Sequence, residues 1–206
     1  MIDRRRVMQS MLAVPAAAWA AHVLAPFDVA VAGEPATLAL DQFVFDARFA
    51  EASDVAEAIG RLGVPLAPFA GDLSELWYRD LDLRWKQAPM ALGGVTTQEG
   101  LFVLETLALD RGMRVVFRGE HGLARDGTVR HTLEGPGMLL EHVSPMPADS
   151  TWPSVLASAM TRCPLGRPDV GKIELVTEVH GISLRDVPLF SWIIAPRADV
   201  ALTLGS

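Results

Sequence analysis

The 206-residue sequence contains a single cysteine, Cys163, and is short of basic residues. One cysteine excludes an intrachain disulfide and every metal site built from several thiolates. Lysine and arginine number 18 against 25 aspartate and glutamate residues, which gives a net charge of −7. This balance argues against general nucleic-acid binding, which depends on clustered basic side chains. No activating partner lies near Cys163 in the sequence, so we predict a small packed residue rather than a reactive thiol.

The sequence also lacks the short motifs that usually identify a reaction. It contains no P-loop ending in Gly-Lys-Ser/Thr and no G-x-G-x-x-G fingerprint. No serine lies in a G-x-S-x-G nucleophile elbow, and no H-E-x-x-H zinc motif is present. The reaction class, if there is one, therefore does not follow from a motif.

Hydrophobic residues make up half of the chain, and only 21% of the residues are charged. This composition supports a sizeable core and argues against global disorder. The length fits one domain. No apolar run after the first 32 residues reaches the roughly 20 residues that span a bilayer.

The N-terminal segment has the organisation of an export signal. Three arginines at positions 4–6 precede an alanine-rich apolar stretch, and "AVA" at positions 30–32 offers a small-residue cleavage site. The segment "DRRRVMQ" resembles the bacterial twin-arginine (Tat) signal, with Arg4-Arg5, a free position and two apolar residues. The first position departs from the common Ser or Thr. An ordinary secretory signal or an uncleaved anchor are the alternatives.

The resemblance to a Tat signal implies a destination rather than an activity. We predict an export signal peptide over residues 1–32, recognised by the Tat export machinery, and a single mature domain over residues 33–206. Tat export implies folding before transport, often because a cofactor or partner is acquired in the cytoplasm. The expected product is a soluble periplasmic or secreted protein with no stable membrane anchor after cleavage. Its cofactor, if any, is unknown from the sequence.

The first half of the mature region alternates between strand-like and helix-like patterns. Segment 48–63 carries the apolar stripe of an amphipathic helix that ends at a glycine. Asp72 and Glu75 show capping-box spacing before a second helix, and Thr96 and Glu99 repeat it before a third. Four strands are predicted between these helices, at 42–47, 64–70, 89–92 and 113–118.

The second half is more antiparallel in character. Asp126-Gly127 lies between two strand-like runs and predicts a hairpin. Pro153 opens a predicted helix that continues to residue 162. Segments 137–143, 172–180 and 188–195 are predicted strands. The fold class predicted is α/β: a single three-layer domain whose mixed sheet has parallel strands in the N-terminal half and an antiparallel hairpin portion in the C-terminal half.

Polar residues follow the first four predicted strands. Parallel strands end at one edge of the sheet, where open α/β sheets bind their ligands. We therefore predict one site at this edge. Its candidate catalytic residues are His121 as general acid/base, with Asp46 and Glu120. Its candidate ligand-binding residues are Arg48, Asp72, Gly93, Gly94, Thr96, Thr97 and Arg118.

The stretch "ALGGVTTQEG" indicates which kind of ligand this edge of the sheet would bind. Two glycines let a backbone approach a ligand closely, and the start of the following helix presents unpaired N–H groups that favour a small anion. The alternative is that the glycines only make a turn and that Thr96 only caps its own helix.

The four histidines of the mature region, His121, His131, His142 and His180, raise the question of a metal site. Three of them have an acidic residue nearby in the sequence. Adjacent residues on a strand point to opposite faces, however, and no H-x-H spacing appears. We therefore predict structural or surface histidines and no metal ligands.

Three functions remain open at this point. The first is an exported protein that binds a small ligand or serves as an accessory protein of an exported enzyme complex. The second is a periplasmic enzyme that acts on a small anionic or carbonyl substrate at the sheet edge. The third is a carrier of a histidine-ligated metal or cofactor.

Overall fold

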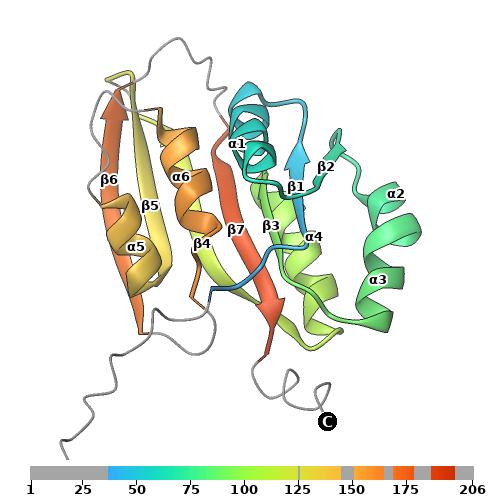
Figure 1. Ribbon diagram of the computed structural model, residues 1–206. Coiled ribbons are helices and arrows are strands. Elements are labelled where there is room, and N and C mark those ends of the chain that lie inside the picture. Colours follow the sequence, from blue (N-terminus) through green and yellow to red (C-terminus); the bar gives the residue numbers. More distant parts are fainter. Residues whose placement is uncertain (1–36, 125, 145–150, 165–168, 179–186, 198–206) are drawn as a thin grey trace, which may run out of the picture. The chain divides into compact units, whose positions relative to one another are not determined.

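A computed structural model describes residues 37–124, 126–144, 151–164, 169–178 and 187–197 (Figure 1). The expected export signal, residues 1–32, and His180 lie outside these ranges. The described residues contain seven strands in one sheet. The strands are β1 (Gln42–Asp46), β2 (Leu66–Phe69), β3 (Leu92–Thr96), β4 (Met113–Leu123), β5 (Thr128–Pro136), β6 (Val170–Glu178) and β7 (Leu189–Pro196).

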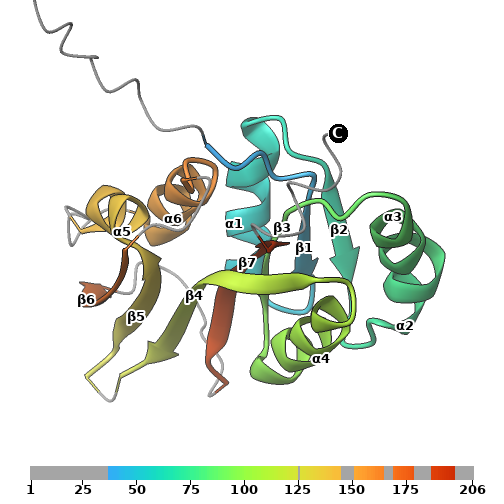
Figure 2. The ribbon, with the colours of Figure 1, turned by 90° about the horizontal axis from the view of Figure 1, so that it is seen from below.

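Helices cover both faces of the sheet, which confirms the predicted three-layer α/β domain (Figures 1 and 2). One layer contains α1 (Ala50–Arg61), α5 (Gly137–Val143) and α6 (Trp152–Met160). On the other face, α4 (Gln98–Leu109) lies alongside a broken helix made of α2 (Ser74–Leu76), a π-helical turn η1 (Trp77–Leu81) and α3 (Asp82–Gln87). None of the described helices is long and apolar enough to cross a membrane.

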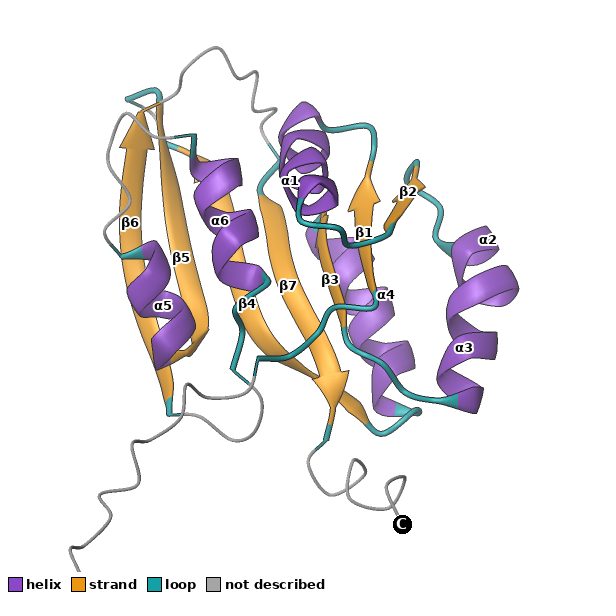
Figure 3. Cartoon of the chain, in the orientation of Figure 1, coloured by secondary structure: helices purple, strands orange, loops and turns teal. Residues whose placement is uncertain are grey.

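The strand order is β2-β1-β3-β7-β4-β5-β6 (Figure 3). β1 pairs in parallel with β2 and β3, as predicted for the N-terminal half. β7 lies between β3 and β4 and runs antiparallel to both, so the four predicted parallel strands share a direction but β4 is separated from the rest. β7 is apolar along most of its length and buried on both faces, which suits it to the centre of a sheet.

Two hydrophobic cores lie on the two faces of the sheet. Phe43, Phe117 and Ile193 pack toward α1 and α6 on one face. On the other, Val44 and Trp192 pack toward α4 and the broken helix. The second layer of helices stops at β4, so this face of β5 and β6 is open; exposed residues alternate with buried ones in β5 and with mostly partly buried ones in β6.

Two sequence predictions are corrected by the structure. Segment 137–143 is the helix α5 and not a strand, because a short apolar run cannot be assigned to either period on its own; Leu139, Leu140 and Val143 are buried together on one helical face. The predicted strand at 89–92 is instead β3, which begins at Leu92 and contains both glycines. The predicted Asp126-Gly127 hairpin is confirmed, and it joins β4 to β5.

Candidate functional site

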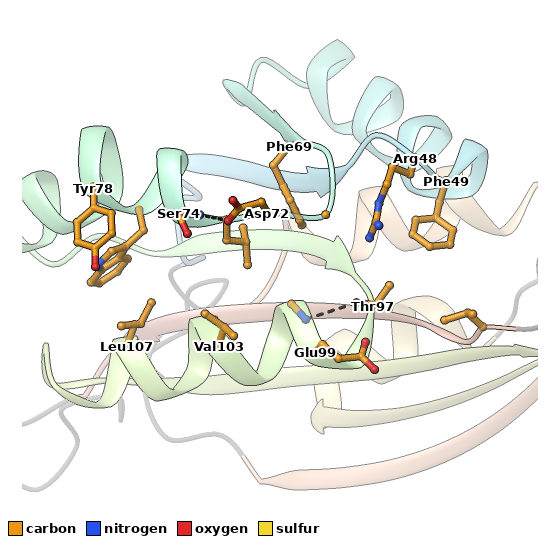
Figure 4. A pocket seen from close by; sticks show the side chains of 15 residues that line it. Arg48, Phe49, Phe69, Asp72, Ser74, Tyr78, Thr97, Glu99, Val103 and Leu107 are labelled. Atoms are coloured by element: carbon orange, nitrogen blue, oxygen red, sulfur yellow. Dashed lines mark hydrogen bonds between the residues drawn. The ribbon is translucent and has the colours of Figure 1, made fainter.

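A cleft of about 710 Å³ lies where β1, β2 and β3 end (Figure 4). One wall comes from the residues that follow β2, including Leu73 and Trp77, and the other from α4. The cleft therefore occupies the sheet edge at which the sequence predicted a ligand site. Its position follows from the parallel pairing of β1 with both neighbours, which brings the three strand ends together.

The walls of the cleft are mainly apolar. Phe69 faces Val103 and Leu107 across it (Figure 4), and Trp77 also lines the cleft. Val103 and Leu107 lie four residues apart on α4, so they form one stripe along the helix. The buried stripe of α4 is a different one, Leu101, Leu104 and Ala108. In the cleft-facing stripe Leu107 is partly buried against the core, whereas Val103 is 42% exposed.

An ion pair closes one end of the cleft. Asp46 is 1% exposed, and its carboxylate accepts hydrogen bonds from Arg48 Nη2 at 2.6 Å and from Arg48 Nε at 2.9 Å. The guanidinium packs against Gly71, where a Cβ atom would lie 2.6 Å from Arg48 Nη1. Gly71 also has a positive φ of 82°, which other residues adopt only at a cost. The bidentate pairing engages Arg48 with Asp46 and so reduces its value for an incoming anion.

Two exposed carboxylates line the cleft, Asp72 and Glu99. The backbone N–H of Ser74 donates to Asp72 at 2.8 Å, and hydrogen bonds from Ser74 lower the pKa of Asp72. The pKa of Glu99 is lowered by its own backbone N–H first and then by the hydroxyl of Thr97. Both side chains are therefore ionised near neutral pH. With Arg48 neutralised by Asp46, the cleft carries a negative charge.

The start of α4 is already occupied by groups of this chain. Thr97 is the N-cap, and its hydroxyl oxygen accepts the Gly100 N–H at 3.4 Å. Glu99 places a carboxylate in the first turn, where it complements the helix dipole. Thr96, the cap predicted from the sequence, is the last residue of β3 and accepts the Trp192 indole N–H at 3.1 Å. The cap falls one residue later because β3 extends through Thr96.

The remaining predicted site residues divide between the cleft and other places. Arg48, Asp72 and Thr97 line the cleft. Arg118 binds Glu105 of α4 at 2.6 Å, and Glu120 is an exposed residue of β4. Gly93 and Gly94 lie inside β3 and make neither a turn nor a ligand cradle, because side chains of the two cores occupy the space over them: Met160 over Gly93 and Trp192 over Gly94.

His121 lies on the opposite face of the sheet from the cleft, in the core beneath α6. It stacks on Trp152 with 4.7 Å between ring centroids. Its Nδ1 lies 2.7 Å from His131 Nδ1, its Nε2 lies 2.8 Å from the Ser191 hydroxyl, and His131 Nε2 lies 2.9 Å from the hydroxyl of Thr177. All four hydrogen-bonded side chains are about 1% exposed or less. These hydrogen bonds link the four side chains in series. None of the four lines the cleft, where Arg48 and its partner Asp46 lie.

The pKa values of both histidines are lowered. Burial is the main cause at His121, with a smaller contribution from the charge of His131, and its pKa lies well below the usual value. Burial lowers the pKa of His131 to about 4. Both rings are therefore neutral at pH 7. Within the described ranges, no group of three or more His, Cys, Asp or Glu side chains is arranged to hold a metal ion.

The apolar residues of the cleft were not predicted as site residues. Trp77 and Trp85 lie eight residues apart in the sequence, about two helical turns, and the structure packs the two rings edge to face at 5.9 Å. The sequence of α4 holds a second signal: its apolar residues occupy more of the helix surface than the helix buries against the sheet. Neither signal says which apolar residues remain uncovered, since that depends on how the helices are placed.

Compared with protein-family models, with curated proteins and with solved structures, this chain matches none. A function must therefore be argued from the site itself.

Proposed function

We propose that this is an exported periplasmic protein that binds a small, largely apolar ligand in the cleft at the ends of β1, β2 and β3. The observation that carries the proposal is the cleft itself, whose walls, formed by Trp77 and α4 among others, are mainly apolar and which also has polar groups in its lining. Ligand pockets typically combine apolar walls with a few polar groups that fix orientation. The export half of the proposal rests on the resemblance of residues 1–32 to a Tat signal.

The charges of the cleft favour a ligand whose polar head is neutral or positive. Asp72 and Glu99 are ionised, and Arg48 is engaged by Asp46. This differs from the small anion expected from the sequence, because that expectation counted Arg48 and the helix start as free. Both carboxylates are exposed, so solvent screens part of their attraction.

Octylammonium and octanoate, which share a chain and differ in the charge of the head, test the ligand proposal. We expect calorimetry to detect octylammonium binding and to find octanoate weaker. Val103→Gln should weaken octylammonium binding about tenfold, because it replaces an apolar wall of the cleft. Phe102→Gln is the matched control, since Phe102 is 67% exposed and does not line the cleft. Tighter binding of octanoate would favour the small anionic ligand expected from the sequence. No binding of either probe would refute the proposal.

The export route has its own test. With both Arg4 and Arg5 replaced by lysine, we expect the chain to stay in the cytoplasm, while the parent protein is recovered from the periplasm with Gly33 as its first residue. Cell fractionation and N-terminal sequencing measure both outcomes. Export of the double-lysine variant would exclude the Tat route and leave an ordinary secretory signal.

An accessory role beside an exported enzyme is the second candidate. The surface around the cleft exposes Tyr78, Phe102 and Leu109, of which Tyr78 is 72% exposed. Exposed aromatic residues are enriched at the energetic centres of protein interfaces. Copurification of a larger exported enzyme with the parent protein, and its loss with Phe102→Gln, would favour this role over a small ligand.

A further inference from the structure

The two edges of the sheet differ in how they are protected. β2 is four residues long, and Pro65 and Pro68 lie at its start and within it. Prolines and short length are ordinary ways to block an edge from pairing with another chain. β6, at the other edge, is nine residues long and contains no proline. Among the described strands none lies beyond it.

We propose that β6 pairs antiparallel with β6 of a second copy of this chain, with Ile173 on the two-fold axis. Antiparallel pairing about a two-fold axis keeps residues of one sheet face together. Centred on Ile173, the pairing sets Lys172 opposite the partner's Glu174 and Val170 opposite the partner's Val176. Both valines are exposed in the single chain, at 69% and 54%, and would cover each other.

The charges of the strand oppose the two adjacent registers. Lys172 and Glu174 form no ion pair with any residue that the structure describes, although both are exposed. A pairing centred on Glu174 would set the two Glu174 carboxylates against each other, and one centred on Lys172 would oppose the two ammonium groups. Like charges directly opposite on paired strands are destabilising, and opposite charges stabilise.

The neighbouring strand extends the same pattern. Within one chain Arg118, Glu134 and Lys172 lie opposite one another across β4, β5 and β6. The partner's Glu174 would continue this row with a fourth charge of alternating sign. On the other face Ile173 and Leu175 are only partly buried and border the core beneath α5, so the pairing would also cover apolar area there.

Sedimentation of the purified protein over a range of concentrations tests the association. We expect a reversible dimer. Lys172→Glu should weaken it by about tenfold or more, because two opposite-charge contacts per dimer become like-charge contacts. The exchanged variant Lys172→Glu/Glu174→Lys should restore it. Arg61→Glu on α1 is the control for charge reversal elsewhere, and circular dichroism checks that every variant is folded.

Cysteine substitution tests the register directly. Ile173→Cys should form a disulfide-linked dimer under mild oxidation, because directly opposite residues of paired strands lie within disulfide range. Leu175→Cys, on the same face and edge, should not. The native Cys163 is buried and should not interfere. A protein that is monomeric at every concentration, or a cross-link through Leu175→Cys instead, would overturn the proposal.

Discussion

Replacing Gly94 by alanine should destabilise the protein by about 3 kcal/mol, at the upper end of the usual cost of overpacking a core. A Cβ atom at this position would lie 2.5 Å from the backbone oxygen of Val44 on β1 and closer still to the indole ring of Trp192. Neither neighbour can move freely, because Val44 O belongs to a paired strand and the Trp192 ring is buried and hydrogen-bonded to Thr96.

Urea denaturation measures this free energy of unfolding. Gly122→Ala is the matched control: it lies in β4, and a Cβ atom there would meet only Pro188, at 4.0 Å. We expect that variant to stay within about 0.5 kcal/mol of the parent protein. If Gly94→Ala proved as stable as Gly122→Ala, the close contact between β3 and Trp192 would be wrong.

Acid should destabilise the fold through His121 and His131. Above pH 6.5 both rings are neutral in the folded and the unfolded chain, so they add no pH dependence. Below pH 6.5 the unfolded chain takes up protons that the folded core resists, since burial lowers the pKa of His131 to about 4 and that of His121 well below its usual value. The free energy of unfolding should therefore fall with pH, by up to about 1.4 kcal/mol per pH unit for each histidine.

Burial is the main reason why the folded core resists protonation, and the hydrogen bond between the two rings opposes protonation of both at once. One Nδ1 must donate and the other accept across the 2.7 Å contact, so two protonated rings would oppose N–H to N–H. For His131 alone the loss between pH 6.5 and 4 amounts to about 3 kcal/mol.

Urea denaturation between pH 4 and 8 gives the measurement. His131→Gln should lower stability at pH 7, because it breaks the hydrogen-bonded chain, and should flatten the dependence on pH. His142→Gln, on the exposed side of α5, is the control and should keep the slope of the parent protein. An equally steep slope in His131→Gln would show that other groups cause the acid sensitivity.

Much of the fold could be predicted from local patterns. The apolar stripe of α1, the Asp126-Gly127 turn and the buried run of β7 each have a period or a turn residue that one segment carries alone. The prediction of a strand at 137–143 was wrong because seven residues are too few to distinguish the helical period from the strand period. The position of β7 between β3 and β4 could not be predicted, because sheet order depends on pairing between distant segments.

The candidate site shows the same division. The sequence placed Arg48, Asp72 and Thr97 at one sheet edge, and the structure brings them to one cleft. His121 was also assigned to this site from the sequence, which was wrong. That assignment depended on the face of β4 from which the His121 ring projects. A register shift in β4 between Val115 and Phe117 precedes His121, so counting from the strand start does not give that face.

The sequence by itself determined the class of fold, the shortage of thiols and basic residues, and the negative charge, because these need only composition and short-range periodicity. The tertiary structure decided where charge and apolar surface remain unused. It paired Arg48 with Asp46, covered Gly94 with Trp192, and left Val103 facing an open cleft. These outcomes depend on contacts between residues far apart in the chain, and no local pattern encodes them.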